Sequence, residues 1–316
     1  DSNVETARVK LFRSLHPPYC TPCNRMPGLE LVPLDSSEAE AYFKVFVAGR
    51  SDLPNPDPIV HLDRYLAMPP VEQRTYFAFK ESGGIVGTVR LVGSEISFFS
   101  LLPDERRWTR DAILLAVEPI IAAGAEKIVA NFEEAYSPEY EKLGFVERFS
   151  RLRMEAPVAK RDPPAIPMAH PEAMDVDGVT ALLVAVYDGH LEQQFGMHVG
   201  GPQEWREYVT GIWKGETGTY LPLASWTARD ERGLAGISLV TLWMGMPLLA
   251  EIGVRKDLRG RGLGRALLTS SLNSLADLNH DRLALYVTVG NDSAIALYKS
   301  FGFESVARTV TAVREL

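Results

Sequence analysis

The chain has 316 residues, of which 46% are hydrophobic and 23% are charged, and this composition fits a globular protein with room for two domains. A formal net charge of −8 and a pI near 5.4 disfavour a nucleic-acid partner, because phosphate contacts need a broad excess of Lys and Arg on one face. Any anion site must therefore be local.

The first 28 residues are proline-rich and predict an irregular extension without the apolar region of a secretory signal. Cys20 and Cys23 form a CxxC pair with no second pair to complete a tetrahedral zinc site. Because prolines flank the pair, loop cysteines are favoured over metal or redox chemistry, although both uses stay open. Two thiols in a chain of this size are typical of a reducing cytoplasm.

Two segments of the first half are repeated in the second. Tyr140 and Tyr298 are each followed four residues later by Gly-Phe, and "LPDERRWTRDAILL" aligns with "RKDLRGRGLGRALL" so that Arg106 matches Arg259. The offset is 153 residues at the arginines and 158 at the tyrosines, which indicates an internal duplication of about 150 residues. We therefore predict an extension, a first domain, a proline-rich linker and a second domain at residues 1–28, 29–158, 159–172 and 173–316.

Hydrophobic periodicity in the second half predicts a mixed α/β unit with a mostly antiparallel sheet flanked by helices. The predicted helices lie at residues 176–188, 202–214, 262–278 and 292–300. The predicted strands lie at residues 219–228, 234–243, 248–255 and 282–289, with a last strand at the end of the chain. The apolar run 236–254 is long enough to cross a bilayer, but Gly245, Pro247 and Glu251 interrupt it, which favours two strands and a turn.

The stretch "VRKDLRGRGLGRALL", residues 254–268, places three glycines between a strand and a helix. The unpaired N–H groups and the positive dipole end of such a helix favour a bound anion, and glycines let the backbone approach it closely. A P-loop requires Lys and then Ser or Thr where Arg265 and Ala266 stand, and a dinucleotide fingerprint requires Gly where Leu267 stands. Both nucleotide-binding motifs are therefore excluded.

The glycine stretch resembles the coenzyme A pyrophosphate loop of the GNAT N-acetyltransferase superfamily, with Arg259, Gly262 and Gly264 at the positions of its pattern. A later segment, "NDSAIALYKSFGF", resembles the family's next motif and contains Asn291 and Tyr298. The two motifs follow in the order that the family has. With the duplication, the resemblance implies two tandem GNAT-like domains of the α/β (α+β) class.

The resemblance implies acetyl-CoA or another acyl-CoA as co-substrate, without a metal. In the family, a tyrosine at the position of Tyr298 protonates the leaving thiolate, and a backbone N–H of the segment 252–254 polarises the thioester carbonyl. Gly253 suggests a β-bulge there. The implied contacts to the co-substrate are Ile252, Gly253, Val254, Arg259, Gly260, Arg261, Gly262, Leu263, Gly264, Asn291, Ala294 and Tyr298. From the residues alone, Asn291 is equally a helix N-cap and Tyr298 a core residue.

A free alkyl amine is mostly protonated at neutral pH, so its attack on a thioester needs a base. Glu251 precedes the acyl-contacting segment and is the candidate, directly or through a water; a solvent-facing strand residue is the alternative. The loop "YDGHLEQQFGMHVGG" is expected to line the acceptor site and to bind a polar cationic acceptor; a solvated loop, which would have a similar sequence, is the alternative. Its candidate substrate residues are Asp188, His190 and His198, beside Glu192.

The first half has lost the glycines of the loop, because Thr109 aligns with Gly262 and Asp111 with Gly264. Asp111 would repel a pyrophosphate group, and Glu133 stands in the place of Asn291. We therefore expect a degenerate first domain that serves as a scaffold or shapes the acceptor pocket.

These features predict a cytoplasmic N-acetyltransferase that transfers an acyl group to a small-molecule amine by direct attack in the second domain. We expect a monomer or homodimer without nucleic-acid or membrane partners. Two alternatives stay open at this point: a non-catalytic acyl-CoA-binding or sensing protein, and a protein N-acetyltransferase.

Overall fold

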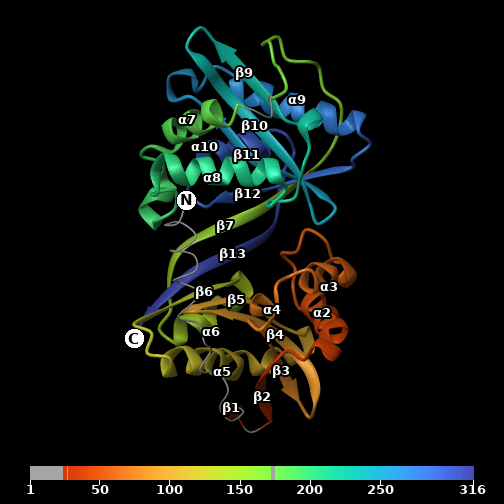
Figure 1. The fold of residues 1–316 in the computed structure, drawn as a ribbon, viewed down its shortest axis with the longest axis vertical. Helices are drawn as coiled ribbons and strands as arrows, with labels where there is room; N and C mark the ends of the chain where they lie inside the picture. The colour runs from red at the N-terminus through yellow and green to blue at the C-terminus, as the bar shows by residue number, and fades with distance from the viewer. Residues whose placement is uncertain (1–23, 27, 172–174) are drawn as a thin grey trace. The chain divides into compact units, whose positions relative to one another are not determined.

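The computed structural model describes residues 24–26, 28–171 and 175–316, and it divides the chain into two compact units. The first unit is Asp1–Arg148 with Val310–Leu316, and the second is Phe149–Thr309. In each unit, helices cover a mostly antiparallel sheet (Figure 1), which confirms the predicted mixed α/β class. Cys20, Cys23 and nearly all of the expected extension lie outside the described residues.

The first unit has six strands of its own, in spatial order β1 to β6, and the end of β13 lies beside β6. The strands are β1 (Asn24–Met26), β2 (Leu29–Pro33), β3 (Tyr76–Glu81), β4 (Gly84–Val92), β5 (Glu95–Leu101) and β6 (Lys127–Glu133). The helices are α2 (Ala39–Ala48), α3 (Pro58–Leu66), α4 (Pro70–Gln73), α5 (Thr109–Ala122) and α6 (Ser137–Lys142). Among the first five strand pairs only β5 and β6 run parallel.

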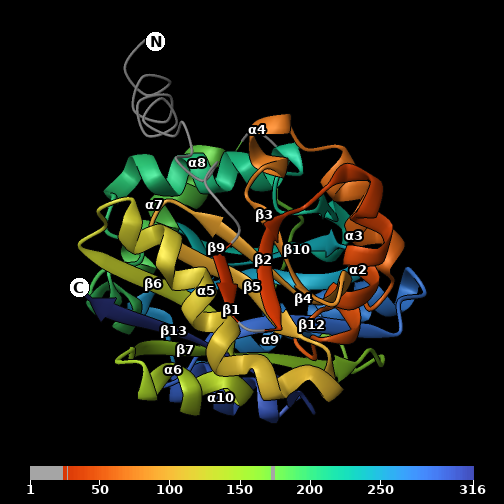
Figure 2. The same ribbon diagram turned by 90° about the horizontal axis from the view of Figure 1, so that it is seen from below.

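Strand β3 shows how this sheet is covered on both faces. Phe77 and Phe79 pack in the cluster that contains α5, whereas Tyr76 and Ala78 pack with α2 and α3. Successive side chains of a strand point to opposite faces, so an almost continuous apolar run is needed here. Figure 2 shows α5 on one side of these strands and α2 and α3 on the other.

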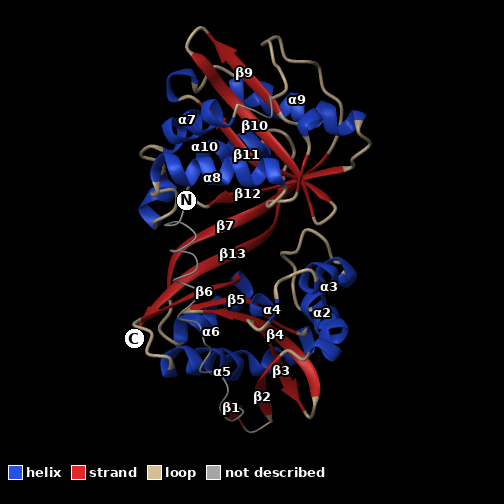
Figure 3. Cartoon of the chain, viewed as in Figure 1, coloured by secondary structure: helices blue, strands red, loops and turns tan. Residues whose placement is uncertain are grey.

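The second unit has the spatial order β7-β12-β11-β10 (Figure 3). Strands β8 and β9 both pair with β10. Its strands are β7 (Val146–Pro157), β8 (Thr219–Tyr220), β9 (Trp226–Asp230), β10 (Gly233–Trp243), β11 (Met246–Val254), β12 (Arg282–Thr288) and β13 (Glu304–Glu315). Its helices are α7 (Val176–Tyr187), α8 (Gly201–Lys214), α9 (Leu263–Asp277) and α10 (Asp292–Lys299). Helices α7 and α8 pack with Ile237 and Leu239 of β10, and α9 packs with Val240 on the other face.

The helices predicted in the second half are confirmed within one residue at either end, but the strand expected at 219–228 is wrong. A 3-10 turn at Pro222–Ala224 divides it into β8 and β9. Ser225 stabilises this interruption, because its hydroxyl donates to Leu221 O and accepts from Val240 N. No part of the described chain contains a helix with both the length and the apolar character needed to cross a bilayer.

The chain changes unit inside two strands. β7 begins in the first unit and belongs to the second from Phe149 onward, while β13 returns to the first unit at Val310. Val310 and Ala312 lie in the core of the first unit. The compact units therefore do not coincide with the domain limits expected from the proline-rich linker. Both changes from one unit to the other occur inside regular strands, so no proline-rich or glycine-rich segment marks them in the sequence.

The two repeated segments form the same series of elements, β5-α5-β6-α6-β7 and β11-α9-β12-α10-β13. Each series contains one parallel strand pair, and each short helix is followed by a left-handed glycine, Gly144 and Gly302. A left-handed glycine is the usual end of a helix, which explains why the Gly-Phe pair recurs after each tyrosine.

Candidate active site

The site begins where two parallel strands separate. β11 and β12 pair only at Leu248↔Ala284 and Leu249↔Leu285. Just beyond, the register of β11 against β10 shifts, and Ala250 is an extra residue in β11. The bulge expected at Gly253 is therefore wrong in position, because the register is regular there. A bulge bends its strand, and this one lies where the gap opens.

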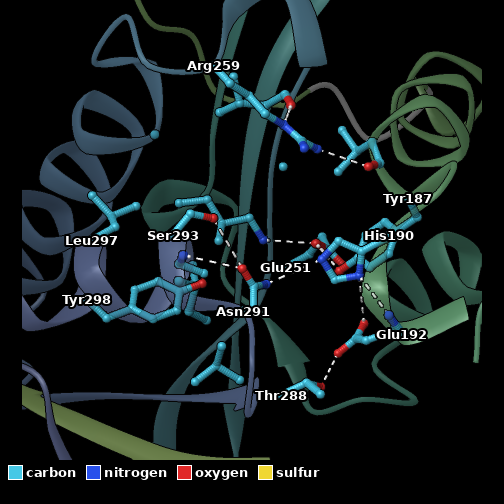
Figure 4. Close-up of a pocket in the computed structure, with 18 of the residues that line it drawn as sticks. Tyr187, His190, Glu192, Glu251, Arg259, Thr288, Asn291, Ser293, Leu297 and Tyr298 are labelled. Atoms are coloured by element: carbon cyan, nitrogen blue, oxygen red, sulfur yellow. Dashed lines mark hydrogen bonds and ion pairs between the residues drawn. The ribbon is translucent and has the colours of Figure 1, made fainter. Parts of the chain in front are cut away.

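A cavity of about 750 Å³ lies at this gap, within the second unit (Figure 4). Most of the residues expected from the sequence line it: Glu251, Ile252, Gly253, Val254, Arg259, Gly260, Gly262, Leu263, Gly264, Asn291, Ala294, Tyr298, His190 and His198. Arg261 and Asp188 do not. The Asp188 side chain is 81% exposed and pairs with Lys256.

The glycine turn has the conformation that the sequence requires. Gly260 and Gly262 have φ of 74° and 84°, a region that other residues rarely adopt. Gly262 is the N-cap of α9 and offers no side-chain hydrogen bond to the first turn, so backbone N–H groups at the start of the helix have no side-chain cap. A Cβ on either glycine would contact nothing within 4 Å, which leaves room for a ligand beside the backbone.

Arg259 fixes this turn to its surroundings. Its Nε donates to Val254 O at 3.2 Å and its guanidinium donates to Val186 O at 3.0 Å, which links the turn to β11 and α7. Arg265 also lines the cavity, donates to Ser300 Oγ and lies over the Phe301 ring. The sequence motif therefore supplies one arginine that holds the loop and another at the start of α9.

Glu251 is a buried carboxylate rather than a solvent-facing strand residue. The Tyr187 hydroxyl donates to its Oε1 at 3.1 Å, and Ile252 N donates to the same oxygen at 3.1 Å. Burial raises the pKa of Glu251 to about 7, against the lowering effect of the hydrogen bond from Tyr187. The group can therefore take up and release a proton near neutral pH.

Glu192 is a second carboxylate in the cavity, and its pKa is shifted in the opposite direction to that of Glu251. It accepts from the Thr288 hydroxyl and pairs with His198 Nε2 at 3.3 Å. Burial alone would raise its pKa, but the hydrogen bonds from His198 and Thr288 and the charge of Arg151 lower that pKa to about 2. Glu192 therefore stays ionised where Glu251 titrates, and two carboxylates with separated pKa values are typical of divided roles.

Tyr298 enters the cavity from α10 and is 6% exposed (Figure 4). Burial raises its pKa, with further contributions from the charges of Glu251 and Glu192, so the hydroxyl keeps its proton at neutral pH. Its hydroxyl makes no hydrogen bond to another residue in the described part of the chain.

Asn291 combines two roles. Its Oδ1 caps α10 by accepting a hydrogen bond from Ala294 N, and its Nδ2 lies 3.3 Å from His190 Nε2.

An aromatic wall lies beside the two carboxylates. His198 stacks on Trp205 with 4.5 Å between ring centroids, and its ring lies 4.7 Å from that of Tyr187. The Tyr208 hydroxyl donates to Ala250 O at the bulge. No local motif in the sequence marks Tyr187, Tyr208, Arg151 or Thr288, since each lies on a different element. Across the described residues, no cluster of three or more His, Cys, Asp or Glu is placed to hold a metal ion.

The equivalent gap of the first unit is filled by side chains. With the offset of 158 residues, Tyr136 corresponds to Ala294, and the Tyr136 hydroxyl accepts a hydrogen bond from Leu101 N at 3.0 Å. With the offset of 153 residues, Leu101 corresponds to Val254. The Tyr136 hydroxyl therefore takes the hydrogen bond of the Leu101 N–H, at the position where the second unit has a cavity.

The other motif positions of the first unit are also committed to the fold. Glu133, in the place of Asn291, accepts from both the backbone N and the hydroxyl of Ser51. Tyr140 is fully buried and stacked on Phe132 with 3.8 Å between centroids, so its hydroxyl cannot reach a substrate. Thr109 begins α5 with its hydroxyl donating to Arg106 O.

These contacts predict one acetyl-CoA per chain, bound in the second unit. Native mass spectrometry of the protein with excess acetyl-CoA is expected to show a single added mass at saturation. Two added molecules per chain would contradict the filled gap in the first unit.

The fold and the site together define a class: an α/β protein in which a strand gap and a glycine turn before a helix line one cavity. Residues 183–303 match the acetyltransferase (GNAT) family. The match falls on the unit that holds the cavity, which is therefore similar to members of that family.

Two relatives are mycothiol acetyltransferases. That of Clavibacter sepedonicus is 33% identical over 46% of this chain and 45% of its own length. That of Corynebacterium aurimucosum is 28% identical over 61% of this chain and 57% of its own length. The chain thus matches about half of the length of these relatives.

Two solved structures share the fold across both units. A GCN5-related N-acetyltransferase from Sphaerobacter thermophilus has a TM-score of 0.69 at 15% identity, and the match covers 91% of this chain and 95% of the other. A tandem GNAT protein from the clavulanic acid biosynthesis pathway has a TM-score of 0.63 at 17% identity, covering 91% and 98%. The expected tandem GNAT-like fold is confirmed.

Proposed function

We propose that the second unit is an acyl-CoA-dependent N-acetyltransferase that acts on the amine of a small molecule. The observation that carries the proposal is one cavity that joins an uncapped glycine turn, a carboxylate with a pKa of about 7 and a protonated tyrosine. A protein that only binds acyl-CoA needs the turn but neither titratable group. The family match and the names of the relatives support the same activity and a small acceptor.

The chain fits acetyl-CoA as co-substrate, which supplies the activated acetyl group. The N–H groups at the start of α9, with Gly260 and Gly262, would hold its pyrophosphate. Alternate residues of a strand share an edge, so the N–H groups of Ile252 and Val254 face the gap while Gly253 faces β10. The N–H of Ile252 already donates to Glu251 Oε1, so the N–H of Val254 is the donor available to polarise a carbonyl oxygen.

The proton path follows from the two side chains. The amine nitrogen forms a bond to the acetyl carbon, the carbon–sulfur bond breaks, and the amine proton goes to Glu251, directly or through a water. The Tyr298 hydroxyl donates a proton to the departing sulfur and recovers one from solvent. Glu251 releases its proton to solvent, so the net products are the acetylated amine and free coenzyme A.

Because the reaction needs acetyl-CoA, we place the protein in the cytoplasm, as the sequence predicted.

Release of the coenzyme A thiol from acetyl-CoA in the presence of a panel of small amines tests the proposed acetyltransferase activity. We expect amine-dependent thiol release and an acetylated amine in the mass spectrum. Binding of acetyl-CoA without thiol release from any amine would leave a sensing role, and acetylation of proteins alone would replace the acceptor class.

A further inference from the structure

Arg151 is a charged side chain of the cavity to which this mechanism gives no step. Arg151 lies on β7, opposite Thr288 of β12, and lines the cavity. Its Nε is buried and has no hydrogen-bond partner in the described residues, and its charge acts on Glu192 without a hydrogen bond between the two side chains. An unsatisfied buried donor is costly, and more so on a charged group, so such an atom calls for a partner that the protein itself does not supply.

Other arginines of the same strand do not share this condition. Arg153 is also buried, but it forms an ion pair with Glu155. Arg148 is exposed, where water satisfies its guanidinium. Arg151 is partly buried like Arg153, but, like Arg148, it has no hydrogen bond or ion pair to a carboxylate in the described residues, and it lies at the wall of a cavity.

Arg151 lies on the acceptor side of the cavity. Its electrostatic neighbours are Glu192 of the loop after α7 and Tyr208 of α8, neither of which belongs to the glycine turn. The cavity thus has ionised Glu192 and titrating Glu251 for an ammonium group and a separate guanidinium for an anion. A guanidinium fork matches carboxylate and phosphate oxygens in pairs.

We propose that Arg151 binds an anionic group of the acceptor, so that the substrates are amines that also carry a carboxylate or a phosphate. This inference rests on the proposed function. It names Arg151 as a specificity-determining residue and the acceptor as a molecule with opposite charges.

Matched amine pairs test the inference: an amino acid against its amide, and an amino alcohol phosphate against the free alcohol. Acetyl-CoA turnover is measured for the wild type, Arg151→Gln, Arg151→Lys and the exposed control Arg148→Gln. The wild type and the control are expected to prefer the anionic member of at least one pair by about tenfold or more in kcat/KM. Arg151→Gln loses that preference and Arg151→Lys keeps part of it, while turnover of the neutral members changes little. The preferred pair tells a carboxylate from a phosphate.

An equal preference for both members in the wild type, or an equal fall for both in Arg151→Gln, would overturn the inference. The second outcome would mean that Arg151 acts only on the charge of Glu192. Calorimetric titration of the same pairs into the protein with coenzyme A separates this failure from that of the proposed function. Binding of the anionic member that Arg151→Gln abolishes supports the inference even if no amine is acetylated, and binding without preference overturns it.

Discussion

Tyr298→Phe lowers kcat for amine acetylation by about 100-fold or more, the range found when a general acid is removed, while the Kd for acetyl-CoA stays within about twofold. The substitution deletes one hydroxyl, and that hydroxyl makes no hydrogen bond to another described residue, so the fold loses nothing that it uses. The ring keeps its contact with Phe303. Steady-state thiol release and calorimetric titration of acetyl-CoA measure the two quantities.

Tyr140→Phe is the matched control, since Tyr140 has the same motif position in the first unit. Its hydroxyl is buried without a hydrogen-bond partner, and its removal is expected to leave turnover unchanged. Equal losses in the two variants, or a weaker Kd in Tyr298→Phe, would contradict the assignment of Tyr298 as the proton donor.

Glu251→Gln has the second large effect. Loss of the base lowers kcat/KM by about 100-fold or more at pH 8. The wild-type rate is expected to fall as the pH drops through about 7, because the carboxylate must be ionised to accept the amine proton and its pKa is about 7. Since kcat/KM reports the free enzyme, a plot of log kcat/KM against pH changes slope near pH 7, and the variant lacks that break.

Asp188→Asn separates this effect from a general change of charge, because the Asp188 side chain is exposed and lies outside the cavity. That variant is expected to keep both the rate and the break near pH 7. A break that persists in Glu251→Gln would assign the titration to another group and remove Glu251 as the base.

The residues of the site that the sequence predicted are those that lie in continuous motifs. Gly262 and Asn291 could be predicted because a glycine turn before a helix and an N-cap are local features with local causes. The role of Tyr298 is implied by the resemblance of its motif to that of the GNAT family, and Glu251 is predicted from its place just before the acyl-contacting segment. Their burial, which gives Glu251 a pKa of about 7, was not predicted, since it depends on helices far away in the chain.

The residues that sequence reasoning missed come from separate elements that only the fold brings together. Arg151 comes from a strand that the proline-rich linker pattern assigned to the first domain. Asp188 and Glu192 are close in sequence and both acidic, but only Glu192, in the 3-10 turn Leu191–Phe195, is buried in the cavity. Composition cannot tell these two carboxylates apart, because the direction of each side chain is set by the turn.

Titration calorimetry of the wild type and Gly262→Asp tests directly whether the glycine turn of the second unit holds acetyl-CoA. The wild type is expected to bind one acetyl-CoA per chain, and Gly262→Asp to bind it at least about tenfold more weakly, since a carboxylate would face the pyrophosphate at a left-handed position. Gly124→Asp places the same residue at a left-handed glycine of the first unit, and this variant is expected to bind acetyl-CoA with the same Kd as the wild type. Unchanged affinity in Gly262→Asp would contradict the account.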